Sequence, residues 1–326
     1  MLNILYSDTK ALLYYNEIKN KIFPRIRKDG NIYIDDIEKN NLINKIGLTK
    51  EKIKEIITSK PKRLIEINSE FMNNYITNFE ESEYFAYTAL KENEKSYCTK
   101  YHEKILNLKR VFNYRQYVSN NYFLAELLDI HTCIYCNRNY VKTIGNTNEK
   151  TARAEYDHFF SQSKYPLLAL SFYNLIPICG NCNKKKLDNN FTLKSHLHPY
   201  SFSDEEKKFT FSFRKKNFIE NNVKINISTN DKASKEKIEK TFSDLHLEKI
   251  YNVHSDKELR DLLDLRYKYS KNYLDILCNK TFESLNLSQE EAYRMIFGIE
   301  TNEDDYHKRP FSKFKHDIIE ELKKSF

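Results

Sequence analysis

The chain lacks the features of membrane-spanning and secreted proteins. Its 326 residues contain no apolar run as long as the roughly 18 residues that a membrane-spanning helix needs. The start of the sequence, MLNILYSD, has neither the basic region nor the apolar stretch of a signal peptide. We therefore expect a soluble protein in the cytoplasm.

Features of flexible linkers are scarce as well. The sequence has only 5 glycines and 6 prolines, and it contains no Ser/Gly-rich tract and no block of like charges. Such a chain has no obvious linker or low-complexity tail. Its hydrophobic content of 40% is enough for an ordinary buried core. We expect any domains to pack against one another.

Disulfide bonds are not expected either, because thiols stay reduced in the cytoplasm. The six cysteines therefore need another explanation. Cys133 and Cys136 form one CxxC pair, and Cys179 and Cys182 form a second. We interpret the two remaining cysteines, Cys98 and Cys278, as small buried hydrophobic residues.

The two CxxC pairs predict a structural zinc site. Each CxxC turn places two sulfurs on one side, so that two turns complete a tetrahedral shell and leave no position open for chemistry. The 42 residues between the pairs are acceptable if they fold as a unit of their own. The alternatives are coincidence or a redox pair, but a redox CxxC normally begins a helix after a strand and needs no second copy.

Positive charge is concentrated around these cysteines. The formal net charge is +8, and residues 131–200 hold nine basic and four acidic residues, a net charge of 9 − 4 = +5. More than half of the excess therefore lies in about a fifth of the chain. This distribution favours an anionic partner for that region.

The spacing of apolar residues divides the chain into three regions. Residues 1–128 carry helical spacing, whereas residues 129–200 consist of short segments of mixed periodicity. Residues 201–326 begin with strict alternation at 209–213 and 223–227, which predicts a β-hairpin, and then return to helical patterns that include 259–276. We expect an α+β fold in which a small central domain lies within a predominantly helical chain.

Residues with catalytic potential lie between and just after the cysteine pairs. Asp157 and His158 are adjacent, Asn174 follows, and Asn183 comes directly after Cys182. An Asp-His pair alone is weak evidence, but here order, spacing and residue type all agree. Residues 131–190 resemble the HNH endonuclease superfamily, with its ββα-metal core, in the subgroup that a zinc site holds together.

The resemblance implies a role for each of these residues. Asp157 and Asn183 would offer oxygen ligands to a divalent cation, Mg²⁺ or Mn²⁺. His158 would act as the general base on the attacking water. Asn174 would brace the loop and orient His158. Asn183 stands where the motif name has its last His, a variant that leaves the mechanism intact.

Several neighbouring residues are considered for other roles. Lys184 and Lys186, on the helix that follows the second cysteine pair, are expected to contact phosphates, although a solvated helix face is the alternative. Glu155 is left out of the site, because it would share a strand face with Asp157 only if the strand is regular. His196 and His198 are expected to be structural.

The expected function is that of a metal-dependent endonuclease that hydrolyses phosphodiester bonds, with DNA as the expected nucleic acid and RNA as the alternative. Residues 165–177 are similar to a bacterial group of HNH proteins, some of which lie beside an ATPase in anti-phage defence systems such as Septu. This similarity implies an ATPase or another defence-system subunit as a partner. Two other classes remain open, namely a non-catalytic zinc-stabilised nucleic-acid-binding module and a structural adaptor.

Overall fold

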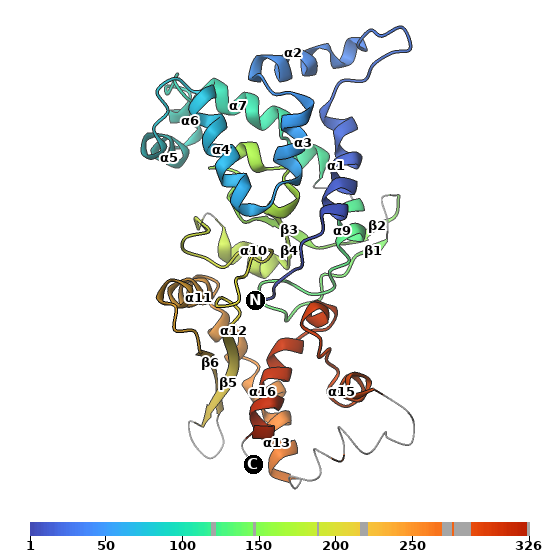
Figure 1. Cartoon of the computed structure of the whole chain (residues 1–326), viewed down its shortest axis with the longest axis vertical. Helices are drawn as coiled ribbons and strands as arrows, with labels where there is room; N and C mark the ends of the chain where they lie inside the picture. The colour runs from blue at the N-terminus through green and yellow to red at the C-terminus, as the bar shows by residue number, and fades with distance from the viewer. Residues whose placement is uncertain are drawn as a thin grey trace.

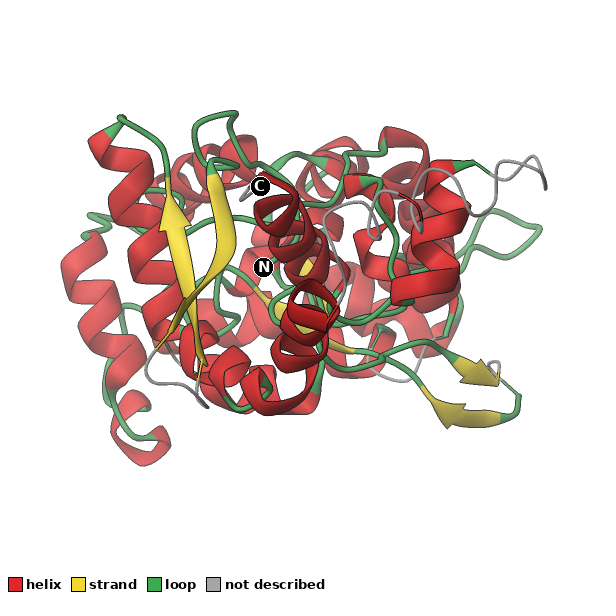
Figure 2. Ribbon diagram, turned by 90° about the horizontal axis from the view of Figure 1, so that it is seen from below, coloured by secondary structure: helices red, strands yellow, loops and turns green. Residues whose placement is uncertain are grey.

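The computed structural model describes residues 1–118, 122–145, 148–187, 189–215, 221–268, 276 and 288–324. Helices dominate these residues, and the strands form small two-stranded sheets, as Figure 2 shows. The predicted α+β class is thus confirmed. None of the helices in the described ranges is long and apolar enough to cross a membrane.

The N-terminal region is helical, as the apolar spacing predicts. Its helices are α1 (Asp8–Ile22), α2 (Ile37–Ile46), α3 (Lys50–Thr58), α4 (Pro61–Tyr75), α5 (Glu81–Ala89), α6 (Glu92–Lys95), α7 (His102–Val111), α8 (Tyr114–Tyr117) and α9 (Phe123–Leu128), with a 3₁₀ turn, η1, at Ile34–Asp36. The Thr49 side chain caps α3 by accepting a hydrogen bond from the backbone N–H of Lys52. Pro61 is the first residue of α4. The backbone N–H at that position has no partner within the helix, so proline removes no helical hydrogen bond there.

The central region contains two strand pairs and one short helix. Its elements are β1 (Ile144–Gly145), β2 (Lys150–Ala152), β3 (Glu155–His158), η2 (Pro166–Leu168), η3 (Phe172–Asn174), β4 (Leu175–Ile178) and α10 (Gly180–Lys186). Strand β3 pairs antiparallel with β4, with Glu155 opposite Ile178 and His158 opposite Leu175. Helix α10 follows β4 directly, so the order is β-β-α. In Figure 1 this unit lies between the N-terminal helices and the C-terminal elements.

The C-terminal region begins with the predicted hairpin. Strands β5 (Phe209–Lys215) and β6 (Asn221–Ile227) pair antiparallel. The remaining elements are α11 (Lys232–Asp244), α12 (Leu247–Asn252), the π-helical turn η4 (Ser255–Leu259), α13 (Arg260–Lys268), α15 (Gln289–Phe297), η7 (Glu303–Lys308) and α16 (Ser312–Lys324). The helix expected at 259–276 is observed up to Lys268, and most of its remainder lies outside the described residues.

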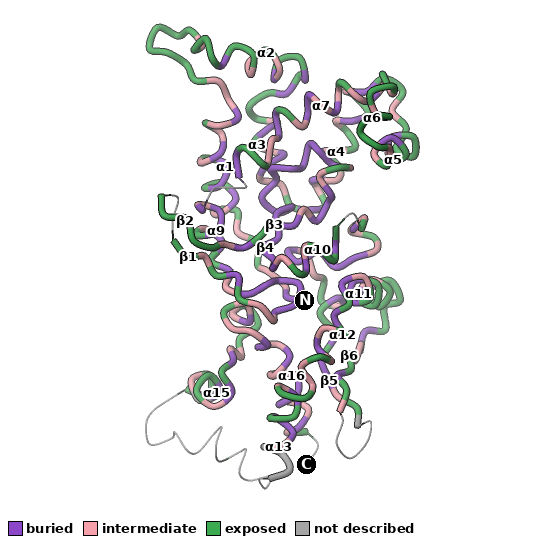
Figure 3. The backbone as a smooth tube through the Cα atoms, turned by 180° about the vertical axis from the view of Figure 1, so that it is seen from behind, coloured by how far each residue is buried: buried purple, intermediate pink, exposed green. Residues whose placement is uncertain are grey.

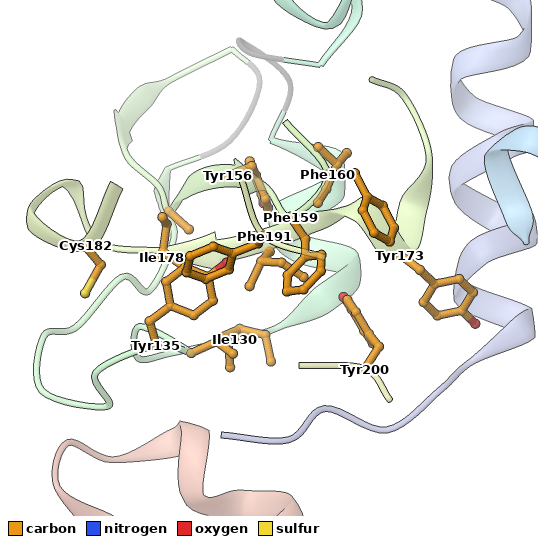
Figure 4. Packing of buried hydrophobic residues seen from close by; sticks show 14 of the residues in the cluster. Ile130, Tyr135, Tyr156, Phe159, Phe160, Tyr173, Ile178, Cys182, Phe191 and Tyr200 are labelled. Carbon is orange, nitrogen blue, oxygen red and sulfur yellow. The ribbon is translucent and has the colours of Figure 1, made fainter. Parts of the chain in front are cut away.

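One hydrophobic core runs through all three regions. Buried residues of α1, the central strands, the hairpin and α16 belong to a single cluster, drawn in purple in Figure 3. Aromatic rings join its parts: Phe172 packs on Tyr14 of α1 with ring centroids 5.6 Å apart, and Tyr173 packs on Tyr200 at 5.1 Å. Figure 4 shows several of these rings around β3. The flanking helices therefore support the central unit by direct packing.

Both flanking regions hold the turn at residues 133–138. The backbone N–H of Leu2 donates to the carbonyl of Ile134 at 2.8 Å, and the hydroxyl of Tyr251 donates to the carbonyl of Cys136 at 2.5 Å. The N–H of Phe311 donates to the carbonyl of Asn137 at 2.6 Å. This turn is consequently fixed from segments far away in the sequence.

Asn137 adds a second tie between the turn and the C-terminal region. It is buried in the left-handed conformation, with φ of 47°, which asparagine tolerates better than most residues. Its Nδ2 donates to the hydroxyl of Thr132 and to the carbonyls of Tyr306 and Arg309 at 2.9–3.1 Å. These three acceptors would lose a donor if the amide were removed.

We predict that Asn137→Ala lowers the free energy of unfolding by about 2–4 kcal/mol, because buried acceptors lose their donor and alanine disfavours a positive φ. Urea unfolding followed by circular dichroism measures this change. The exposed Asn181 provides a control, since Asn181→Ala should change stability by no more than about 0.5 kcal/mol. Equal effects of the two substitutions would contradict the role of Asn137.

Candidate metal and active site

The four paired cysteines come together in space. Their Sγ atoms all lie within 4.8 Å of one another, and all four residues are buried. The Nδ2 of Asn139 donates to the Sγ of Cys179 at 3.3 Å, as is common beside thiolate ligands. Four sulfurs at this spacing suit one tetrahedral zinc ion. Among the described residues this is the one metal-ligand cluster of its kind.

Asn174 holds the loop that joins β3 and β4. Its Nδ2 donates to the carbonyls of Phe160 and Leu168 at 3.1 and 3.0 Å, and its Oδ1 accepts from the N–H of Phe160 at 2.7 Å. The side chain is fully buried, so no water replaces these bonds. Asn174 thereby fixes both arms of the loop directly after His158.

His158, at the end of β3, is oriented by a backbone carbonyl. Its Nε2 lies 2.9 Å from the carbonyl oxygen of Ala169, which can only accept, so Nε2 carries the proton. Nδ1 is then the nitrogen with the free lone pair. The edge of the Tyr114 ring packs at 4.6 Å, and burial lowers the pKa of His158 below its ordinary value. The ring is therefore held neutral, with Nδ1 able to accept a proton.

Asp157 is buried and contacted on both oxygens. Its side chain is only 6% exposed, and the hydroxyl of Tyr135 donates to Oδ2 at 2.5 Å. The ammonium of Lys186 donates to Oδ1 at 2.9 Å and also to the carbonyl of His158. Lys186 is only 1% exposed and lies over the ring of Phe191. A buried carboxylate is thus compensated by a buried cation.

Asn183, on α10, faces Glu155 at the start of β3. Its Nδ2 donates to Oε2 of Glu155 at 2.8 Å, which leaves the Oδ1 of Asn183 as an acceptor. Gly180 lies beneath the same carboxylate, where a Cβ atom would come within 2.8 Å of Oε1. Glycine therefore permits the close approach of β3 and α10.

A shallow groove runs beside this pair. It is lined by cationic, amide and aromatic side chains and by the start of α10: Arg138, Asn139, Tyr140, Glu155, Cys179, Gly180, Asn181 and Lys184. Lys184 and Lys185 are both exposed, but only Lys184 is among the lining residues. The groove thus offers positive charge and an exposed ring next to Glu155.

Comparison with protein-family models gives a match to the HNH endonuclease family over residues 133–189. Residues 133–189 are an HNH endonuclease domain. The match starts at the first cysteine and ends after α10, so it spans β3, β4, α10 and all four cysteines. Searches of curated proteins and of solved structures gave no match.

The residues that the sequence singles out lie on β3, η3 and α10 of the HNH domain, where Asn183 contacts Glu155 and Asp157 contacts Lys186. Asp157 and His158 lie on β3, Asn174 is the last residue of η3, and Asn183 and Lys184 lie on α10. One expectation is corrected. Lys186, expected to contact phosphate, is instead buried against Asp157. The face of α10 that carries Lys186 turns towards β3, so this ammonium is not on the surface.

Sequence reasoning missed Tyr135 and left Glu155 out of the site, yet both contact residues that it singled out. Tyr135 contacts Asp157, although the two residues lie 22 positions apart in the sequence. Glu155 contacts Asn183, and its spacing of two residues from Asp157 on a regular strand was the available signal. Both contacts arise from packing between segments.

His196, His198 and Cys98 lie outside this cluster. His196 lies between Ser195 and Asp244 and stacks on Phe191, whereas His198 packs in the aromatic core. These contacts are structural, as expected. Cys98 is half-buried and separate from the other thiols, and Cys278 lies outside the described residues.

We predict that the purified protein contains about one zinc ion per chain and that Cys179→Ser loses it, because three sulfurs cannot complete the tetrahedral shell. Elemental analysis of the purified protein measures the zinc content. Cys98→Ser is the matched control and should retain zinc. If Cys179→Ser keeps its zinc, or wild type has none, the four-cysteine site is wrong.

We also predict that Lys186→Met lowers the free energy of unfolding by about 3–5 kcal/mol, because it leaves the buried carboxylate of Asp157 without its cation. Lys185→Met, one residue away on the exposed side of α10, should change it by no more than about 0.5 kcal/mol. Urea unfolding of both variants tests the difference. A Lys186→Met protein as stable as wild type would refute the ion pair.

Proposed function

We propose that the HNH domain is a metal-dependent endonuclease that hydrolyses phosphodiester bonds of DNA. The observation that carries this proposal is the fixed orientation of the His158 imidazole. The carbonyl of Ala169 takes the Nε2 proton of His158 and leaves Nδ1 as a base, as a hydrolytic mechanism requires. A binding protein would not need an imidazole fixed in one tautomer.

The donor set fits a hard divalent cation. Asp157 uses one acceptor site on each oxygen for Tyr135 and Lys186, and a carboxylate has about four such sites. Asn183 keeps its Oδ1 available, because its Nδ2 is turned to Glu155. Carboxylate and amide oxygens are ligands that Mg²⁺ and Mn²⁺ prefer. Asp157 and Asn183 are therefore the residues proposed to hold the cation.

Each of these side chains has its own role in the proposed hydrolysis. Nδ1 of His158 accepts a proton from water as the water oxygen bonds to phosphorus and the bond from phosphorus to the leaving oxygen breaks. Asn174 holds the loop that carries Ala169 by donating to the carbonyl of Leu168. The Ala169 carbonyl thus stays in place and keeps the His158 imidazole in one orientation. Asp157 and Asn183 would hold the divalent cation, which would supply charge stabilisation to the phosphoryl and leaving oxygens.

The groove beside Glu155 is the proposed path of the substrate strand. Lys184 and Arg138 line it and can neutralise phosphates, and Tyr140, which is 64% exposed, offers a ring to a base. The position of the groove next to Asn183 supports this assignment. In this role Lys184 contacts nucleic acid, whereas Lys186 forms an ion pair with Asp157.

The proposed setting is bacterial anti-phage defence in the cytoplasm, with an ATPase or another defence-system subunit as partner. This part of the proposal rests on the similarity of residues 165–177 to Septu-type HNH proteins. Most of these residues are fully buried in the structure. They therefore support the domain type, and the partner would contact other surfaces.

A non-catalytic nucleic-acid-binding module is the second candidate. The observation in its favour is the ion pair of Asp157 and Lys186, since a carboxylate can be buried with a lysine for stability alone. The two candidates agree on zinc and on nucleic-acid binding. They differ on cation-dependent turnover.

We predict that the wild-type protein nicks supercoiled plasmid DNA with Mg²⁺ or Mn²⁺ and that His158→Ala lowers the rate about 10²- to 10⁴-fold, the usual contribution of a general base. Gel analysis of nicked and linear DNA measures the rate, with zinc content checked in each protein.

The control for this experiment is His131→Ala, because His131 pairs with Asp129 and lies outside the site. It should cleave at the wild-type rate. Plasmid binding without cleavage by the wild-type protein, at any concentration of either cation, would favour the binding module.

A further inference from the structure

We propose that Tyr135 is a positioning residue that couples the affinity of Asp157 for its divalent cation to the four-cysteine site. This inference rests on the proposed function, in which Asp157 is a cation ligand. It adds a link between two metal sites that share no ligand.

The first observation is the place of Tyr135 in the chain. It lies between Cys133 and Cys136, so both ends of its short turn belong to the four-cysteine cluster. The backbone of the turn is tied to β4 by the N–H of Ile134, which donates to the carbonyl of Pro177 at 3.2 Å. The Tyr135 ring is fully buried and packs near Phe191, as Figure 4 shows. Its hydroxyl therefore moves only if the cysteine turn moves.

The second observation is the hydrogen bonding of Asp157. Tyr135 donates to Oδ2 and Lys186 donates to Oδ1, at 2.5 and 2.9 Å. Two donors on different oxygens fix the plane of a carboxylate, and the remaining lone pairs then have set directions. Because Asp157 is buried, water cannot substitute for a lost donor without rearrangement.

The two donors also differ in what anchors them. Lys186 belongs to α10 and holds Asp157 from the helix, through a long side chain that crosses the Phe191 ring. The side chain of Tyr135 rotates about only two torsion angles, and its backbone belongs to the cysteine turn. Bound zinc would fix the turn, the turn would fix the hydroxyl, and the hydroxyl would set the direction of the carboxylate. Outer contacts of this kind usually change metal affinity about 10- to 100-fold.

A purely structural role for Tyr135 gives a different expectation. If the ring only fills space, replacing tyrosine with phenylalanine keeps the packing and leaves cation affinity unchanged. The neighbouring Tyr156 provides this comparison, because it is buried on β3 and its hydroxyl has no hydrogen-bond partner. Tyr135→Phe and Tyr156→Phe each remove one hydroxyl, but only the hydroxyl of Tyr135 contacts Asp157.

The experiment measures Mn²⁺ binding to wild type, Tyr135→Phe and Tyr156→Phe by electron paramagnetic resonance of free Mn²⁺, with zinc content determined in each sample. We expect Tyr135→Phe to raise the Kd for Mn²⁺ about 10-fold while keeping its zinc. Tyr156→Phe should bind Mn²⁺ like wild type. In plasmid cleavage, Tyr135→Phe should need about 10-fold more Mn²⁺ for half-maximal rate and recover at saturating Mn²⁺.

An unchanged Kd in Tyr135→Phe, with zinc retained, overturns the coupling and leaves the nuclease proposal standing. An equal rise in both variants also overturns it, since the effect would then come from packing. If wild type itself binds no Mn²⁺ and cleaves no plasmid, the proposed function fails together with the inference, and the two failures are told apart by the wild-type sample.

Discussion

The close approach of four sulfurs is the constraint on which the rest of the HNH domain depends. Cysteine side chains from two turns, 42 residues apart, lie within 4.8 Å of one another. Four thiolates at this separation repel one another unless a cation joins them, and zinc binding supplies folding free energy of order 10 kcal/mol to small domains. The strand pair β3–β4 and helix α10 fall between or at these turns. Closing the cluster therefore ties α10, which carries Cys182 and Asn183, to the turn that carries Tyr135.

The second constraint is a buried charge. Asp157 has to be desolvated to sit between the strand pair and α10, and an isolated carboxylate there would be very costly. Lys186 compensates that charge from within the domain, and Phe191 covers its ammonium. Such a pair adds little net stability but requires one arrangement of α10 against β3. The ligands of a cation site keep their geometry only if the residues around them are held in place in this way.

The helical flanks extend this rigidity. The cysteine turn at residues 133–138 receives hydrogen bonds from Leu2, Tyr251 and Phe311, which lie in both flanking regions. One continuous core links α1 and α16 to the central strands. A domain of fewer than about 60 residues buries little surface alone, and the flanks supply the additional packing. The order of the candidate active site is thus a property of the whole chain.

The sequence by itself determined the α+β class, the hairpin, the two cysteine pairs and the local motif of Asp157, His158, Asn174 and Asn183. These features depend on short-range periodicity and on residue chemistry at close spacing, which the linear order preserves. Only the tertiary structure decided the partners of these residues. Lys186 turned inward because α10 packs one face on β3, and Tyr135 and Glu155 joined the site through contacts across 22 and 28 positions. Such contacts depend on how segments pack in three dimensions. The spacing of Glu155 and Asp157 along β3 indicates a shared strand face, but it does not contain the partner that each residue contacts.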